Sequence, residues 1–186
     1  MKNTLTILSY FIIALWAINP LFATADESVS EDSIFDYQFT LNASIDKVWP
    51  VFLQQDKWLL NYDIELLSGD YKKVGAIRKI KYKSQQALDS AYIIETIKVE
   101  EPVRFVTKAY TLDDADYGEI KQFFGYDDFK LFDEGGKTRV EFNSYIEFLS
   151  NEMTQEEIER YVTTLLVNAR KEWSMYVKQL DELLRD

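Results

Sequence analysis

The sequence predicts an α+β fold in which a curved antiparallel sheet of seven strands wraps around one long C-terminal helix. Three observations support this fold class. One strand pattern opens the domain, six more follow between residues 64 and 148, and apolar side chains then recur at helical spacing to the end of the chain. Consecutive strands joined by short turns pair antiparallel, so we expect a meander with the helix across one face.

Size and composition indicate one globular domain with restricted chemistry. The chain has 186 residues, of which 47% are hydrophobic and 15% aromatic, enough for one large core. It has no cysteine and no histidine, which excludes disulfides, thiolate and imidazole metal sites, and nucleophilic catalysis by Cys or a Ser–His pair. The net charge of −11 argues against a nucleic-acid partner. We therefore expect no cofactor and no metal.

Residues 1–25 have the pattern of a cleavable export signal. Lys2 precedes an apolar stretch, and Pro20 breaks the helix before the A-x-A sequence Ala23-Thr24-Ala25. Cleavage after Ala25 would place the protein in the periplasm. The alternative is an uncleaved membrane anchor formed by residues 5–22.

Two further segments follow the export signal. Residues 26–34 are acidic and contain serines, so we expect a disordered leader. The folded domain then spans residues 35–186.

One strand and two short helices are expected to open the domain. Apolar residues alternate with polar ones at Phe35, Tyr37, Phe39 and Leu41. Residues 45–53 follow a capping Ser44 and form a short amphipathic helix. A second helical turn is expected over residues 57–62, where it carries Trp58 and Tyr62.

Six strands are expected next, separated by turn residues such as Ser68-Gly69-Asp70, Glu101-Pro102 and Asp133-Glu134-Gly135-Gly136. Their predicted ranges are 64–68, 76–83, 91–100, 104–112, 118–132 and 138–148.

A helix of about 30 residues should close the domain. Thr154 and Glu157 match the capping box that begins a helix. Its apolar stripe consists of Ile158, Tyr161, Val162, Leu165, Ala169, Trp173, Tyr176, Leu180 and Leu184. At the standard rise the helix would be about 45 Å long, enough to cross a whole sheet. A coiled coil is the alternative.

Four short segments carry a family resemblance. They are Phe39-Thr40-Leu41-Asn42-Ala43-Ser44-Ile45-Asp46-Lys47-Val48-Trp49, Val74-Gly75-Ala76-Ile77-Arg78, Glu101-Pro102-Val103-Arg104-Phe105 and Gly135-Gly136-Lys137-Thr138-Arg139-Val140-Glu141-Phe142. Through them residues 35–186 resemble the START-like (SRPBCC, polyketide cyclase/dehydrase) superfamily. The resemblance implies a helix-grip fold with a cavity between sheet and helix, here in an exported member.

The residues themselves also favour a cavity, because one helix and two short ones do not cover a seven-stranded sheet. Either a ligand or large aromatic side chains must fill the remaining space. Alternation predicts that Val140, Phe142, Ser144, Ile146 and Phe148 face inward, together with Phe39, Leu41, Ile93, Ile97, Phe105 and Phe129. From the long helix, Leu165, Ala169, Trp173 and Tyr176 should meet them. Trp58 and Tyr62 are expected at a pocket entrance.

Arg78 is the most informative polar residue, because it shares its predicted face with Ile80 and Tyr82. A buried guanidinium needs a partner. One interpretation is an internal pair with Glu95; another is contact with the carboxylate or phosphate head group of a ligand. A third has Arg78 exposed. Together with the aromatic residues, these predictions give the candidate ligand-binding set Trp58, Tyr62, Arg78, Tyr82, Glu95, Phe129, Phe142, Leu165, Trp173 and Tyr176.

No spacing selects a catalytic pair among the carboxylates and phenols, and Asp127-Asp128, near a turn, is interpreted as solvated. We expect a periplasmic, non-enzymatic binder of a lipid or other hydrophobic small molecule. The basic segment of residues 72–83 would allow transient contact with anionic lipid. The alternatives are a protein-interaction module, whose partner the sequence does not identify, and a cyclase- or hydratase-type enzyme.

Overall fold

A computed structural model describes residues 34–83, 91–112, 122–149 and 153–185, with side chains omitted at residues 122, 148 and 149. All of them belong to the unit of residues 32–186. The predicted export signal and all but the last residue of the predicted leader lie outside the described residues. In the described part of the chain, no helix is both long and apolar enough to cross a membrane.

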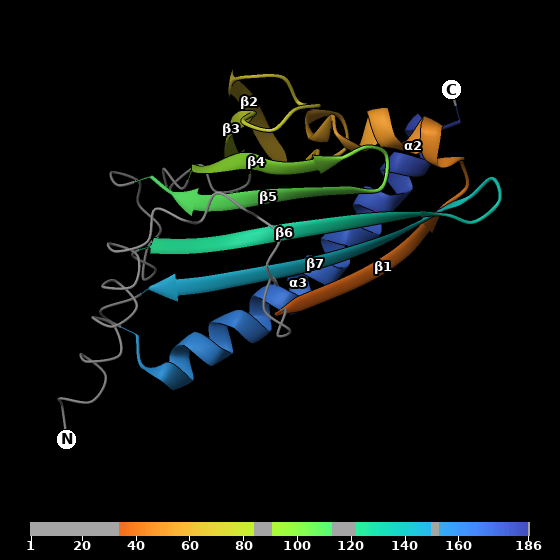
Figure 1. The fold of residues 1–186 in the computed structure, drawn as a ribbon. Helices are drawn as coiled ribbons and strands as arrows, with labels where there is room; N and C mark the ends of the chain where they lie inside the picture. The colour runs from red at the N-terminus through yellow and green to blue at the C-terminus, as the bar shows by residue number, and fades with distance from the viewer. Residues whose placement is uncertain (1–33, 84–90, 113–121, 150–152, 186) are drawn as a thin grey trace. The chain divides into compact units, whose positions relative to one another are not determined.

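The described residues form a seven-stranded antiparallel sheet and a long C-terminal helix, which confirms the predicted fold class (Figure 1). The elements, in chain order, are β1 (Phe35–Leu41), α2 (Ile45–Phe52), η1 (Gln55–Lys57), β2 (Tyr62–Ser68), β3 (Ile77–Tyr82), β4 (Tyr92–Glu100), β5 (Arg104–Thr111), β6 (Gln122–Asp133), β7 (Thr138–Leu149) and α3 (Gln155–Leu183).

The strand order is β1-β7-β6-β5-β4-β3-β2, so the first two strands form opposite edges of the sheet. The segment containing α2 and η1 connects these edges. It buries Val48, Trp49 and Phe52 from α2 and Trp58 just after η1. We call the face of the sheet that α2, η1 and α3 cover the inner face.

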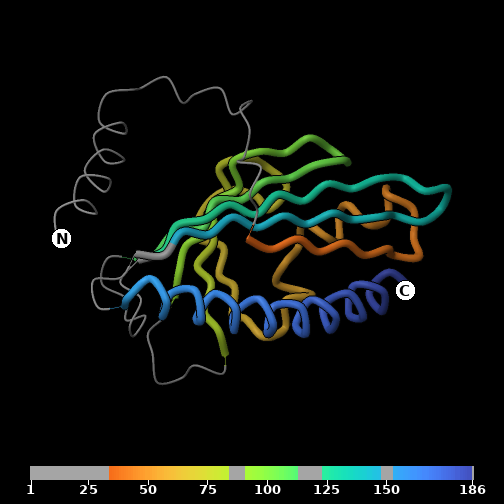
Figure 2. Tube along the Cα trace, turned by 90° about the horizontal axis from the view of Figure 1, so that it is seen from below, coloured from red at the N-terminus to blue at the C-terminus, as the bar shows by residue number. Residues whose placement is uncertain are grey.

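Helix α3 runs along the sheet, as Figures 1 and 2 show. Its capping box is present: the Glu157 backbone N–H donates to Thr154 Oγ1, and the Thr154 backbone N–H donates to the Glu157 carboxylate at 2.7 Å. The helix buries Trp173, Tyr176 and Leu180, all in its C-terminal half. Every residue from 155 to 172 keeps exposed surface, so the two halves of α3 have different surroundings.

Strand pairing confirms most of the predicted inner face. Phe39 lies opposite Val140, and Phe129 lies between Phe105 and Phe142 on the neighbouring strands. All five are buried. The side chain of Phe148 lies outside the described residues.

The prediction was wrong on β4. Ile93 pairs with Lys79 and therefore shares the outer face, whereas Ile94 pairs with Arg78 on the inner face. Ile97 is the extra residue of a β-bulge between Thr96 and Lys98. Two causes combined here: the consecutive isoleucines fit either register, and a bulge breaks simple alternation.

The second predicted helical turn was also misplaced. The structure has a three-residue 3₁₀ turn, η1, and Tyr62 is already the first residue of β2. Tyr62 pairs across the strands with Tyr82, and their rings meet edge to face at 5.0 Å. This aromatic cross-strand pair favours strand over helix at residue 62.

Candidate functional site

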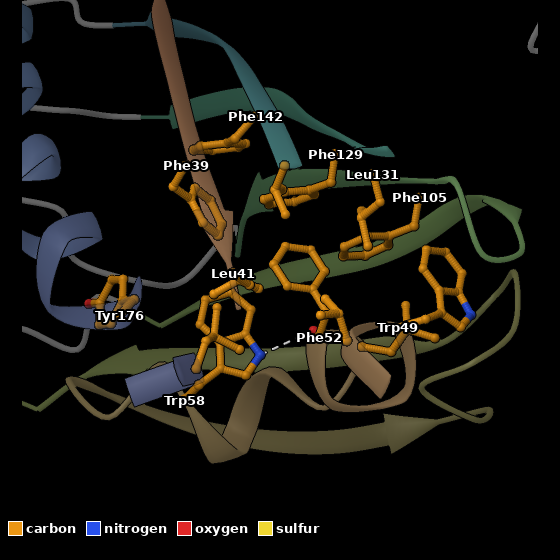
Figure 3. Close-up of a cluster of buried hydrophobic side chains, with 14 of the residues drawn as sticks. Phe39, Leu41, Trp49, Phe52, Trp58, Phe105, Phe129, Leu131, Phe142 and Tyr176 are labelled. Carbon is orange, nitrogen blue, oxygen red and sulfur yellow. Dashed lines mark hydrogen bonds between the residues drawn. The ribbon is translucent and has the colours of Figure 1, made fainter. Parts of the chain in front are cut away.

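The space beneath the C-terminal half of α3 is filled with aromatic side chains. We call this group the aromatic core; Figure 3 shows most of it. Its members, all of them buried, are Phe39, Phe52, Trp58, Phe105, Phe129, Phe142 and Trp173. Ring centroids lie 4.5 Å apart between Phe129 and Phe142, and 4.6 Å apart between Phe142 and Trp173. In this half of the fold, side chains rather than a ligand fill the predicted cavity.

Trp58 belongs to this core and does not line a pocket entrance as expected. It is 0% exposed, it stacks on Phe52 at 5.2 Å, and its indole N–H donates to the Phe52 carbonyl at 3.1 Å (Figure 3). The bond satisfies its one polar atom, so full burial carries no penalty there.

A different set of side chains lies farther along the inner face. We call it the polar cluster: Tyr62 on β2, Tyr82 on β3, Tyr92 on β4, Asp127 on β6 and Glu172 on α3. All five are partly exposed, in contrast to the closed aromatic core. Tyrosines from three strands and acidic residues from β6 and the facing helix thus each keep some exposed surface.

Glu172 connects the helix to the sheet. Its carboxylate accepts hydrogen bonds from the Tyr82 hydroxyl at 2.7 Å and from the Tyr176 hydroxyl at 3.1 Å. Burial, followed by the negative charge of Glu172, raises the pKa of Tyr62. Tyr62 is therefore neutral at physiological pH and acts as a hydrogen-bonding group.

Asp127 is the second carboxylate of the cluster. The Ser144 hydroxyl on β7 donates to its Oδ1 at 2.7 Å. Burial nevertheless raises the pKa of Asp127 from 3.8 to about 6, and the Ser144 bond opposes this shift. A carboxyl group with such a pKa exchanges its proton near neutral pH.

Tyr92 lies in the field of both carboxylates. Its pKa is raised first by burial and then by Tyr62, Asp127, Tyr176 and Glu172. The same two acidic residues raise the pKa of Tyr62. Asp127 and Glu172 therefore act on one shared region, although they come from opposite sides of it.

Arg78 is fully buried, but it does not pair with Glu95. Its Nη1 donates to Gln55 Oε1 at 2.6 Å and its Nη2 donates to Thr96 Oγ1 at 2.7 Å. Burial lowers the pKa of Arg78 to about 10. Glu95 lies opposite Ile77 on the outer face, because Thr96 and not Glu95 shares the face of Arg78. The predicted Arg78–Glu95 pair was wrong.

The ten predicted site residues thus fall in separate places. Tyr62 and Tyr82 belong to the polar cluster, and Tyr176 adjoins it. Leu165 is partly exposed on α3, two turns before Glu172. Trp58, Phe129, Phe142 and Trp173 belong to the aromatic core. Arg78 donates a hydrogen bond to Gln55 in η1, and Glu95 lies on the outer face.

Sequence reasoning missed three members of the polar cluster as a site: Tyr92, Asp127 and Glu172. Asp127 was interpreted as solvated, but it lies within β6 on the inner face, two residues before Phe129. Its neighbour Asp128 faces outward and accepts two bonds from Arg104 at 3.0 Å. Residues two positions apart in a strand share a face, so the predicted inward position of Phe129 also indicated an inward-facing Asp127.

Two solvent-open hollows lie beside β2 and β3, around Asp63, Lys81 and Lys83. They carry charges of both signs, including a Lys83–Asp63 ion pair at 3.6 Å. Across the described ranges, no group of three or more acidic side chains could hold a metal ion.

No protein-family model matches the chain, and no curated protein matches its sequence. Solved structures do match. A conserved protein from Geobacillus kaustophilus has a TM-score of 0.57 and 14% identity, covering 81% of this chain and 93% of that one. Ara h 8.0201 has a TM-score of 0.56 and 10% identity, covering 81% and 95%. Norcoclaurine synthase from Thalictrum flavum has a TM-score of 0.56 and 14% identity, covering 81% and 91%. These similarities support the helix-grip fold.

Proposed function

We propose that the protein binds a hydrophobic small molecule between residues 155–172 of α3 and the inner face, with the polar cluster contacting the polar group of that molecule. One observation carries this proposal. Tyr62, Tyr92 and Asp127 lie deep enough for burial to raise their pKa values, yet each of these residues keeps some exposed surface. A tightly packed core leaves no such surface.

The surroundings of the cluster suit an apolar ligand. Leu165, Leu166 and Ala169 on α3 are partly exposed, with Leu166 and Ala169 also packed against the buried core, and Ile94 and Phe123 lie on the inner face of the sheet. Small-molecule sites typically combine an apolar lining with a few convergent polar groups. The fold alone does not decide the function, since one of the structural neighbours is a synthase, so the proposal rests on the site.

A second candidate is a proton-transfer enzyme, and the raised pKa of Asp127 favours it. A carboxyl group with a pKa of about 6 can accept and return a proton near neutral pH. Glu172, fixed by two phenols, would orient the substrate. Turnover of a bound molecule by the wild-type protein, abolished in Asp127→Asn, would support this candidate over simple binding.

Filling the site tests the binding proposal. Leu165→Trp should weaken calorimetric binding of decan-1-ol about tenfold or more, because the larger side chain occupies the ligand space. Val167→Trp is the matched control, since Val167 is 51% exposed on the same helix. Equal binding by both variants, with folding verified by circular dichroism, would contradict the proposed location.

We further propose that this binding takes place in the periplasm after cleavage at Ala25. The support is the export pattern of residues 1–25. Intact-mass measurement of protein from the periplasmic fraction should give a chain beginning at Asp26. A full-length chain in the membrane pellet would contradict export by cleavage.

A further inference from the structure

We propose that the polar cluster selects a ligand that carries a protonated amine on its apolar body. This inference rests on the proposed function and adds the chemical class of the ligand. It replaces the earlier interpretation that Arg78 receives an anionic head group.

The distribution of charge on the sheet supports a cationic ligand. Among the described strand residues, the Lys and Arg side chains share the outer face, and Arg78 is the exception. Arg78 already donates to Gln55 and Thr96. On α3, Arg160, Lys171 and Lys178 are exposed, and the guanidinium of Arg170, a residue that is also exposed, lies over the Phe35 ring on β1 at 5.3 Å. The polar cluster thus contains two carboxylates and no cation.

A second observation lies beside Asp127. Thr107 pairs directly with Asp127 across β5 and β6, and it is 0% exposed. Its Oγ1 has no hydrogen-bond partner within the described structure. A buried hydroxyl without a partner costs free energy, so this position favours a group that completes its hydrogen bonding.

An ammonium group matches the acceptors that converge here. It has three N–H donors and no acceptor. Asp127 uses Oδ1 for Ser144, which leaves Oδ2 as an acceptor, and Thr107 Oγ1 lies on the adjacent strand. Glu172 contributes negative charge from the helix side. A ligand carboxylate would instead face two like charges in a desolvated region.

The pH dependence follows from the groups around Asp127. Ser144 and Thr107 flank it on the sheet, and Tyr62 and Tyr92 lie in the field of both Asp127 and Glu172. None of these groups is cationic, and Arg170 of α3, a cation on this side of the sheet, lies over Phe35, the strand partner of Ser144. Amine binding should strengthen as the pH rises through about 6, where Asp127 ionises, and should then level off.

Calorimetric titration with three probes of one chain length tests the inference: decylamine, decan-1-ol and decanoate. At physiological ionic strength, decylamine should bind about tenfold or more tightly than decan-1-ol, with decanoate weakest. Asp127→Asn and Glu172→Gln should each lower the amine-to-alcohol preference about tenfold. Glu182→Gln removes the same charge from an exposed site on the same helix and should leave the preference unchanged, which controls for attraction to a protein of net charge −11.

The failures are distinguishable. Equal binding of the three probes, or tighter binding of decanoate, would overturn the amine inference and leave the proposed binding function intact. A preference that Glu182→Gln lowers as much as Glu172→Gln would also overturn it. Binding of none of the three would contradict the proposed function itself.

Discussion

The aromatic core and the polar cluster share one face of one sheet and are covered by the same helix, yet they differ in packing and chemistry. On α3, Trp173 belongs to the core, while Glu172 beside it belongs to the cluster. On β6, Phe129 and Asp127 are two residues apart on the same face. Residues that stabilise the fold therefore lie only one position along the helix, or two along the strand, from residues available to a ligand.

This difference indicates a division of roles. Close-packed aromatic rings bury apolar surface, which dominates folding stability. Buried carboxylates cost stability unless they are fully paired, and proteins keep such groups mainly at functional sites. We therefore expect substitutions in the core to change stability and substitutions in the cluster to change binding.

The largest effect is expected at Trp173. Its ring lies within 6.0 Å of Tyr37, Phe39, Trp58, Phe129, Phe142 and Tyr176. Trp173→Ala should lower the free energy of unfolding by about 3 to 5 kcal/mol, measured by urea denaturation. Leu165→Ala, near the cluster, should cost about 1 kcal/mol. Similar losses for both variants would mean that the two regions are equally packed.

A smaller effect is expected at Arg78. Arg78→Lys should cost about 2 kcal/mol, because a lysine does not reproduce the two-pronged contact with Gln55 and Thr96. Glu95→Gln should change stability by less than about 0.5 kcal/mol, since Glu95 lies on the outer face. Thermal unfolding of both variants measures these changes. A loss at Glu95 as large as that at Arg78 would restore the pair predicted from sequence.

The smallest expected effect has the opposite sign. The pKa of Asp127 is raised on folding, so the native state holds its proton more tightly and stability falls as the pH rises from about 4 to about 6. Asp127→Asn removes the buried charge. It should match wild type near pH 4 and become more stable by about 1 to 2 kcal/mol at pH 7. Urea denaturation of both proteins between pH 4 and pH 7 measures this difference. If Asp127→Asn is less stable than wild type at pH 7, the ionised carboxylate of Asp127 does not destabilise the native state.

Periodicity was sufficient to predict most of the fold. The alternation from Phe35 to Leu41 and the capping box at Thr154 each express a local rule, and both elements formed where expected. Tyr62 was misplaced because its cross-strand partner Tyr82 is 20 positions away in sequence, beyond any local pattern. Long-range pairing overrides local preference in sheets.

The candidate site was less predictable than the fold. Tyr62 and Tyr82 were selected as aromatic residues, but the acidic groups Asp127 and Glu172 were not selected as a pair. They are 45 positions apart in sequence, and both act on Tyr62 and Tyr92 only because α3 crosses the sheet. The β-bulge at Ile97 changes which residues of β4 face inward, and no local sequence pattern predicts a bulge there.

The most direct test of the account follows backbone amide shifts by NMR while decylamine is added to the uniformly labelled protein. We predict that the largest shifts occur at Tyr92, Thr107, Asp127, Leu165 and Glu172, with small changes at Phe52 and Phe105 in the aromatic core. Shifts concentrated in the aromatic core, or on the outer face around Glu95, Arg104 and Asp128, would contradict the claim that the polar cluster is the ligand site.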